Sequence, residues 1–180
     1  MSSLEFSKNF FQLFDLPAQF ELDQSLLGQR FRHLQQELHP DRYAGASDYQ
    51  QRVAVQYSAR VNEAYVTLRK PLARAIYLLQ LAGMTGEDIS SQHVDGGFLM
   101  EQMELREKLE SIDKMVDPEM ALDHLSNDIS NAIKSHEVEF AQAFAREALE
   151  ESAIACVKMQ YLTRLLEEVE QIESMLIDSM

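Results

Sequence analysis

The sequence predicts an all-helical protein made of two units. Six glycines and four prolines among 180 residues are too few for the many tight turns of a β-sandwich or barrel. Hydrophobic residues make up 46% of the chain, which is enough for it to fold. In several segments the apolar residues recur at intervals of three and four, which places them on one side of an α-helix.

Two helices are expected before residue 40. A short one over residues 9–14 stops near Pro17, because the residue before a proline avoids helical geometry. Asp23 is a favourable N-cap for the second helix, and Pro40 ends it. The apolar stripe of this second helix consists of Leu27, Phe31, Leu34 and Leu38.

Two more helices complete the N-terminal unit. Ser47 can cap a long third helix, and Pro71 suits the first position of a fourth helix that ends at Gly83. The apolar stripe of the third helix consists of Val53, Tyr57, Val61, Ala64 and Leu68. The residues expected to be buried in the core of this unit are Leu34, Leu38, Val61 and Leu68.

The C-terminal part is predicted to be a helical bundle behind a linker. Residues 84–97 are typical of a linker, because glycine and serine interrupt them. Three apolar stripes then predict an antiparallel three-helix bundle over residues 98–180. Its first helix ends near Val116, where Asp117 and Pro118 cap and begin the second.

The last helix of the bundle is predicted to begin after a break between Phe144 and Glu151 and to run to about Ile177. Its stripe consists of Leu162, Leu165, Val169, Ile172 and Leu176. The residues expected to be buried in the bundle core are Leu109, Ile112, Leu162, Val169 and Ile172.

Charge is distributed unevenly between the two parts. Residues 1–83 hold nine Lys/Arg and eight Asp/Glu, whereas residues 84–180 hold seven Lys/Arg and 22 Asp/Glu. This step suggests two modules with different partners, although the acidity can also serve solubility alone. The acidic half argues against a nucleic-acid partner, whose phosphates require a basic surface.

Residues of the kinds that carry catalysis or bind metals are sparse. Cys156 is the one cysteine, so neither an internal disulfide nor a paired-cysteine zinc site can form. Its apolar neighbours favour a buried, inert thiol. The histidines lack the spacing of a metal-ligand motif. We therefore expect no enzymatic activity, metal or cofactor. The first residues show neither a basic n-region nor an apolar h-region, and no stretch approaches the length of a membrane span. We therefore expect a soluble, cytoplasmic protein without a membrane partner.

His39-Pro40-Asp41 lies in the turn that ends the second helix. Taken alone, this tripeptide could be an ordinary turn, since proline and aspartate are common there. The outward face of the preceding helix is neutral to basic, which suits an acidic protein partner or is simply a solvated surface. Its residues are Gln29, Arg32, His33 and Gln36, with Arg30 on a flank.

With these features, residues 9–83 resemble the J-domain family, whose members stimulate ATP hydrolysis by DnaK-type chaperones. The resemblance implies an N-terminal J-domain over residues 1–83, an antiparallel helical hairpin with short helices. The residues to which it assigns chaperone binding are His39, Pro40, Asp41, Arg32 and Arg42, with Arg30 as an addition. Gly28 stands where many J-domains have a basic residue.

Further segments are similar to the HscB family. They are Asn62-Glu63-Ala64-Tyr65 with Leu68, Pro71, Arg74-Ala75, Tyr77-Leu78-Leu79 and Phe98-Leu99-Met100-Glu101-Gln102-Met103-Glu104-Leu105-Arg106-Glu107. Members of this family are co-chaperones of iron–sulfur cluster biogenesis. The resemblance implies that residues 98–180 bind a scaffold protein of the IscU type, which the chain presents to a DnaK-type chaperone of the HscA type.

The helix from Phe98 has two apolar faces. One faces the predicted bundle core and consists of Phe98, Leu105, Leu109, Ile112 and Val116. Leu99, Met100 and Met103 point the other way, and an exposed apolar cluster of this kind is typical of an interaction site, or else of an interdomain contact. The residues to which the resemblance assigns scaffold binding are Leu99, Met100, Met103, Glu104, Glu107 and Tyr161, the last usually Phe in the family.

Two alternatives remain open from the sequence. The chain could be a J-protein that delivers a different client, although it lacks the Gly-rich or Cys-rich client modules common in such proteins. It could also be a structural helical adaptor in which His39-Pro40-Asp41 is a coincidence.

Overall fold

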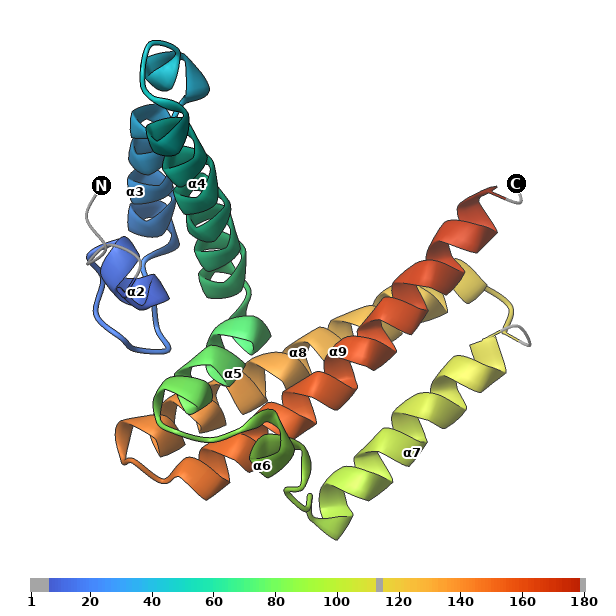
Figure 1. Cartoon of the computed structure of the whole chain (residues 1–180). Coiled ribbons are helices and arrows are strands. Elements are labelled where there is room, and N and C mark those ends of the chain that lie inside the picture. The colour runs from blue at the N-terminus through green and yellow to red at the C-terminus, as the bar shows by residue number, and fades with distance from the viewer. Residues whose placement is uncertain (1–6, 113–114, 179–180) are drawn as a thin grey trace. The chain divides into compact units, whose positions relative to one another are not determined.

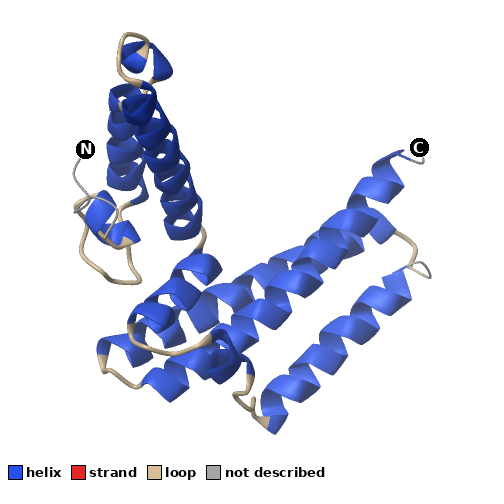
Figure 2. Cartoon of the chain, viewed as in Figure 1, coloured by secondary structure: helices blue, strands red, loops and turns tan. Residues whose placement is uncertain are grey.

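The computed structural model describes residues 7–112 and 115–178 (Figure 1). Within these ranges every regular element is helical and none is a strand, so the predicted all-helical fold is confirmed (Figure 2). The chain divides into two compact units between Leu78 and Leu79. None of the described helices is long and apolar enough to cross a membrane.

The N-terminal unit is built on a hairpin of two long helices. Its elements are α2 (Phe10–Leu13), α3 (Gln24–Glu37), the 3-10 helix η1 (Pro40–Tyr43), α4 (Asp48–Arg69) and the first part of α5 (Pro71–Leu81). The Asp23 carboxylate caps α3 by accepting the N–H groups of Ser25 and Leu26, as the sequence predicts. Ser47 caps α4 in the same manner, through the N–H of Gln50. In Figure 1, α3 and α4 lie side by side and η1 closes the hairpin at one end.

The hairpin encloses the core of this unit. Leu38, Val61 and Leu68 are buried as predicted, and Phe31 of α3 stacks on Tyr65 of α4 with ring centroids 3.9 Å apart. The expected burial of Leu34 is wrong, because this residue is only half-buried. Among the described elements α4 is the main helix that packs against α3, so the stripe of α3 is covered mainly from one side.

The C-terminal unit contains α6 (Gly86–Ser90), α7 (Gly96–Ser111), α8 (Pro118–Ala145) and α9 (Leu149–Asp178). Asp117 caps α8 and Pro118 occupies its first turn, as predicted. The chain breaks between α8 and α9 at residues 146–148, within the predicted interval, where Glu147 adopts a φ of 59°.

Three expectations about this unit need correction. Leu109 and Ile172 are half-buried against the core instead of fully buried in it, whereas Ile112, Leu162 and Val169 are buried. Val116 does not lie on the bundle face but is fully exposed. Because α7 ends at Ser111, the helical periodicity that would place Val116 beside Ile112 does not reach it.

The segment expected to be a linker is partly helical. Thr85 and Asp88 form a capping box that starts α6, and Ile89 of this short helix is buried. Figure 1 and the packing both place α6 against α9. Along the chain, the boundary between the two compact units falls within α5. The limits predicted from the sequence, at residues 83 and 98, concern functional modules and stay a prediction.

Candidate functional site

The turn that contains His39, Pro40 and Asp41 exposes two polar side chains. The α3 helix ends at Glu37 with Leu38 as its C-cap, and Pro40 begins η1. The backbone N–H of Asp41 donates to Nδ1 of His39 over 3.3 Å, so the neutral imidazole carries its proton on Nε2. The side chains of His39 and Asp41 are both exposed. Local hydrogen bonding thus fixes the imidazole and leaves its outer edge free to meet a partner.

Arg32 and Arg42 are also exposed. Among the residues that the structure describes, neither side chain makes a hydrogen bond or an ion pair. A Cβ added to Gly28 would lie 3.5 Å from Nη1 of Arg32, so the Arg32 guanidinium occupies the surface above this glycine. The basic face of α3 is therefore continuous at the position where Gly28 provides no charge.

An apolar groove of about 650 Å³ adjoins the same turn. Pro40 and Tyr43 line it from η1, and Val55 and Ala59 line it from α4. Sequence reasoning missed this groove, although Val55 stands off the buried stripe of α4 and is exposed. The turn thus presents polar groups beside an apolar depression, which are the components of a protein-docking surface.

Arg30 differs from the other two arginines. Its Nη1 donates to the carbonyl oxygens of Phe14 and Asp15 over 2.9 and 3.0 Å and lies 2.6 Å from Oδ2 of Asp15. The Arg30 guanidinium beside Asp15 lowers the pKa of that carboxyl. Asp15 also has a φ of 50°, a backbone conformation that is strained for a residue other than glycine. Arg30 therefore fastens α3 to the turn after α2, and chaperone binding by this residue stays a prediction.

We expect Arg30→Ala to lower the melting temperature of the chain by a few degrees, because it leaves two backbone carbonyls of the Asp15 turn without their donor. Arg32→Ala is the matched control, since it removes an exposed arginine of the same helix and should leave the melting temperature unchanged. Thermal unfolding followed by circular dichroism checks both variants. Equal melting temperatures for the two would contradict the anchoring role.

A second candidate surface lies on α7. Leu99, Met100 and Met103 are 49%, 66% and 63% exposed, while Phe98 and Leu105 of the same helix are buried. The two-faced pattern predicted from the sequence is therefore confirmed for these residues. Glu104 and Glu107 are exposed as well, and they add negative charge at the margin of the apolar cluster.

Tyr161 brings α9 into this surface. Its side chain is 39% exposed, and its ring meets that of Phe98 edge to face, with centroids 6.4 Å apart. Because Phe98 directly precedes Leu99 in α7, the tyrosine borders the α7 cluster. The structure thus places Tyr161, one of the residues to which the resemblance assigns scaffold binding, against the residue that precedes Leu99 in α7.

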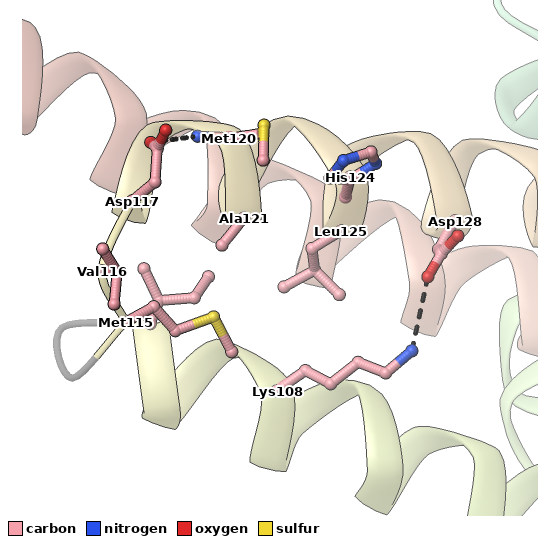
Figure 3. A pocket seen from close by; sticks show the side chains of 10 residues that line it. Lys108, Met115, Val116, Asp117, Met120, Ala121, His124, Leu125 and Asp128 are labelled. Atoms are coloured by element: carbon pink, nitrogen blue, oxygen red, sulfur yellow. Dashed lines mark hydrogen bonds and ion pairs between the residues drawn. The ribbon is translucent and has the colours of Figure 1, made fainter.

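A pocket of about 710 Å³ lies at the other end of α7, where that helix leads into α8 (Figure 3). Ile112, Met115, Val116 and Met120 line it, and the ion pair of Lys108 and Asp128, 3.3 Å long, spans one side (Figure 3). None of the residues predicted to bind the chaperone or the scaffold lines this pocket. It is therefore separate from both candidate surfaces.

The described residues offer neither a metal-ligand cluster nor a reactive thiol. Within the described part of the chain, no three His, Cys, Asp or Glu residues are grouped so as to hold a metal ion. Cys156 is buried, and this burial raises the pKa of its thiol to about 12, so the nucleophilic thiolate is suppressed. The candidate functional groups are therefore the exposed side chains of the His39-Pro40-Asp41 turn and of the α7 surface.

Comparisons with known proteins agree with this description. Residues 94–170 match the family model described as the HSCB C-terminal oligomerisation domain. The chain is 42% identical to the co-chaperone protein HscB homolog of Aliivibrio fischeri and 41% identical to that of Vibrio cholerae. Each match covers 94% of this chain and 99% of the relative.

Solved structures show the same architecture. The chaperone HscB from Vibrio cholerae superposes with a TM-score of 0.83 at 41% identity, covering 94% of this chain and 99% of the other. The human co-chaperone protein HscB also gives 0.83, at 29% identity, with 93% of this chain and 83% of the other covered. The relatives and the shared fold identify a helical co-chaperone with a J-type N-terminal unit, and not an enzyme. The chain belongs to the HscB co-chaperone family.

Proposed function

We propose that this chain binds an iron–sulfur scaffold protein of the IscU type and delivers it to a DnaK-type chaperone of the HscA type in the cytoplasm. In this proposal the chain stimulates the ATPase of the chaperone and so supports cluster assembly and transfer. The single observation that carries the proposal is the exposure of Leu99, Met100 and Met103 opposite a buried face of the same helix.

Scaffold binding is proposed to occur on the α7 surface with Tyr161. Three large apolar side chains and an aromatic ring provide the anchors that usually carry an interface. Glu104 and Glu107 flank them, and such marginal charges contribute to orientation and association rate more than to affinity. This surface therefore suits a client with an apolar patch bordered by basic residues.

Chaperone docking is proposed to occur at the turn of the N-terminal unit. His39, Pro40 and Asp41 supply the contact on which ATPase stimulation depends, and the exposed Arg32 and Arg42 supply positive charge. The functional modules proposed are a J-domain over residues 1–83, a linker over residues 84–97 and a client-binding bundle over residues 98–180.

The experiment that tests the proposal is a calorimetric titration of the full chain with an IscU-type scaffold protein, followed by ATPase assays with an HscA-type chaperone. A saturable complex together with faster ATP hydrolysis supports the proposal. Stimulation of the chaperone without scaffold binding would favour a J-protein for another client, and the absence of both would favour a structural adaptor.

Arg32→Ala is expected to weaken chaperone docking, with the larger effect at low ionic strength. Exposed charges are screened beyond about 10 Å in 0.1 M salt, so the contribution of this guanidinium fades as salt is added. The measurement is the chain concentration needed for half-maximal ATPase stimulation, at low and at high salt. A loss that does not depend on salt would mean that Arg32 does not act through its charge.

A further inference from the structure

The start of α7 is fastened to α9 through a single carboxylate. Oδ1 of Asp95 accepts the N–H of Phe98 over 2.9 Å and thereby caps α7. Oδ2 of the same residue lies 2.7 Å from Nζ of Lys158 in α9. One side chain thus both begins the helix and ties it to its neighbour.

Lys158 makes a second contact with the same end of α7. Its side chain is only 14% exposed, and its ammonium lies 5.4 Å from the centroid of the Phe98 ring. A cation over an aromatic face is attracted by the ring quadrupole, more strongly where water is excluded. Phe98 also makes edge-to-face contacts with His136 of α8 and Tyr161 of α9, so its ring is held by both neighbouring helices.

The other polar ties of α7 are weaker. Arg106 pairs with Glu168 over 3.4 Å and Lys108 with Asp128 over 3.3 Å, and all four side chains are about half exposed. Exposed pairs of this kind contribute little to stability. Near the cluster of Leu99, Met100 and Met103, the contacts of Asp95, Phe98 and Lys158 therefore decide where the helix lies.

We propose that Lys158 is a positioning residue, which holds the first turns of α7 against α9 and so fixes Leu99, Met100 and Met103 beside Tyr161 in the geometry that a scaffold binds. A surface that is fixed before binding loses less conformational freedom when the partner docks. The identity of the partner rests on the proposed function, whereas the anchoring of α7 does not.

The ion pair persists at neutral pH. The hydrogen bond from Lys158, followed by that from the Phe98 N–H, lowers the pKa of Asp95 to about 2. The carboxylate is therefore charged under any condition in which the chain would meet a partner, and neutralising it requires a substitution.

The test compares four variants of the full chain. Lys158→Met keeps most of the stem and removes the ammonium, and Lys158→Arg restores a cation. Asp95→Asn keeps an oxygen that can cap α7 but loses the charge. Lys108→Met is the matched control, since it breaks the exposed tie of the same helix. The readouts are affinity for an IscU-type scaffold, amide hydrogen exchange of residues 98–103 in the free chain, and ATPase stimulation without scaffold.

Lys158→Met and Asp95→Asn are each expected to weaken scaffold affinity about tenfold and to speed exchange in the first turns of α7 by a similar factor. Lys158→Arg should recover most of both losses, and Lys108→Met should change neither. ATPase stimulation without scaffold should stay at the wild-type level in all four variants.

Three outcomes would overturn the inference. The first is unchanged scaffold affinity in Lys158→Met. The second is weaker scaffold affinity in Lys158→Met with unchanged amide exchange in α7, which would make Lys158 a direct scaffold contact. The third is a loss of scaffold affinity in Lys108→Met equal to that in Lys158→Met. Failure of the wild-type chain itself to bind the scaffold would instead count against the proposed function, and the exchange comparison would still decide whether Lys158 anchors α7. If Lys158→Met does not fold, Asp95→Asn provides the same comparison.

Discussion

Replacing Leu99, Met100 and Met103 together by alanine is expected to lower scaffold affinity at least about 100-fold, because a few central apolar anchors usually carry most of an interface. The three side chains are exposed, so their loss opens no cavity in the core. Each truncation should therefore cost far less than the roughly 2–5 kcal/mol expected for a buried Leu or Met. Scaffold titration beside thermal melting measures both effects.

A matched control for this variant replaces Met115, Met120 and Met175, which are exposed but lie off the cluster, and it should bind the scaffold like the wild type. Tyr161→Ala should behave like the α7 variant, with a smaller loss. A large drop in melting temperature with unchanged affinity would show that Leu99, Met100 and Met103 are structural and that the client binds elsewhere.

The second large effect is expected at the turn of the N-terminal unit. His39→Gln should reduce chaperone ATP hydrolysis to its unstimulated rate, because the imidazole edge that faces the partner is removed. Stability should change by no more than about 0.5 kcal/mol, since His39 is exposed and its ring accepts a hydrogen bond only from the nearby Asp41 N–H among the described residues. Steady-state ATP turnover and thermal melting are the measurements.

His93→Gln is the control for this substitution, because His93 is exposed and lies far along the chain from the turn. It should stimulate the chaperone at the wild-type rate. If His39→Gln stimulated equally well, the turn would be an ordinary connection between α3 and α4 and chaperone docking would have to be assigned to other residues.

Local signals account for most of what could be predicted about the fold. Asp23, Ser47 and Asp117 each begin a helix as expected, because a capping side chain bonds to backbone groups only two or three residues away. That Leu99 and Met103 point away from the buried Phe98 and Leu105 was also predictable, since it depends only on the period of one helix. These features require no knowledge of where other helices lie.

The predictions that need correction depend on contacts between distant segments. Leu34 lies on the stripe of α3, yet its burial depends on how many helices cover that stripe. Val116 does not lie on the bundle face because α7 ends at Ser111, and no glycine or proline near Ser111 signals that end in the sequence. Ile89 lies in a short helix that packs on α9 and buries it, whereas the glycine- and serine-rich sequence around it indicates a linker.

The candidate site shows the same division. Periodicity places Leu99 and Met100 on one face, but it cannot reveal that Lys158, far along the chain, holds that face in position. Periodicity places Arg30 on the flank of the outward face and Arg32 within that face, but it cannot reveal that the Asp15 turn occupies the donors of Arg30. The nature of the partners follows from the resemblance to the HscB family and not from the spacing of residues.

The most direct test of the central proposal is the ATPase rate of an HscA-type chaperone measured with the chain alone, with the scaffold alone and with both. We predict that the chain and the scaffold together stimulate the ATPase more than the sum of their separate effects. His39→Gln should remove all stimulation by the chain. The alanine variant of Leu99, Met100 and Met103 should lose only the part of the stimulation that depends on the scaffold. The proposal would be contradicted if adding the scaffold left the stimulation by the wild-type chain unchanged and if the alanine variant stimulated the ATPase equally well.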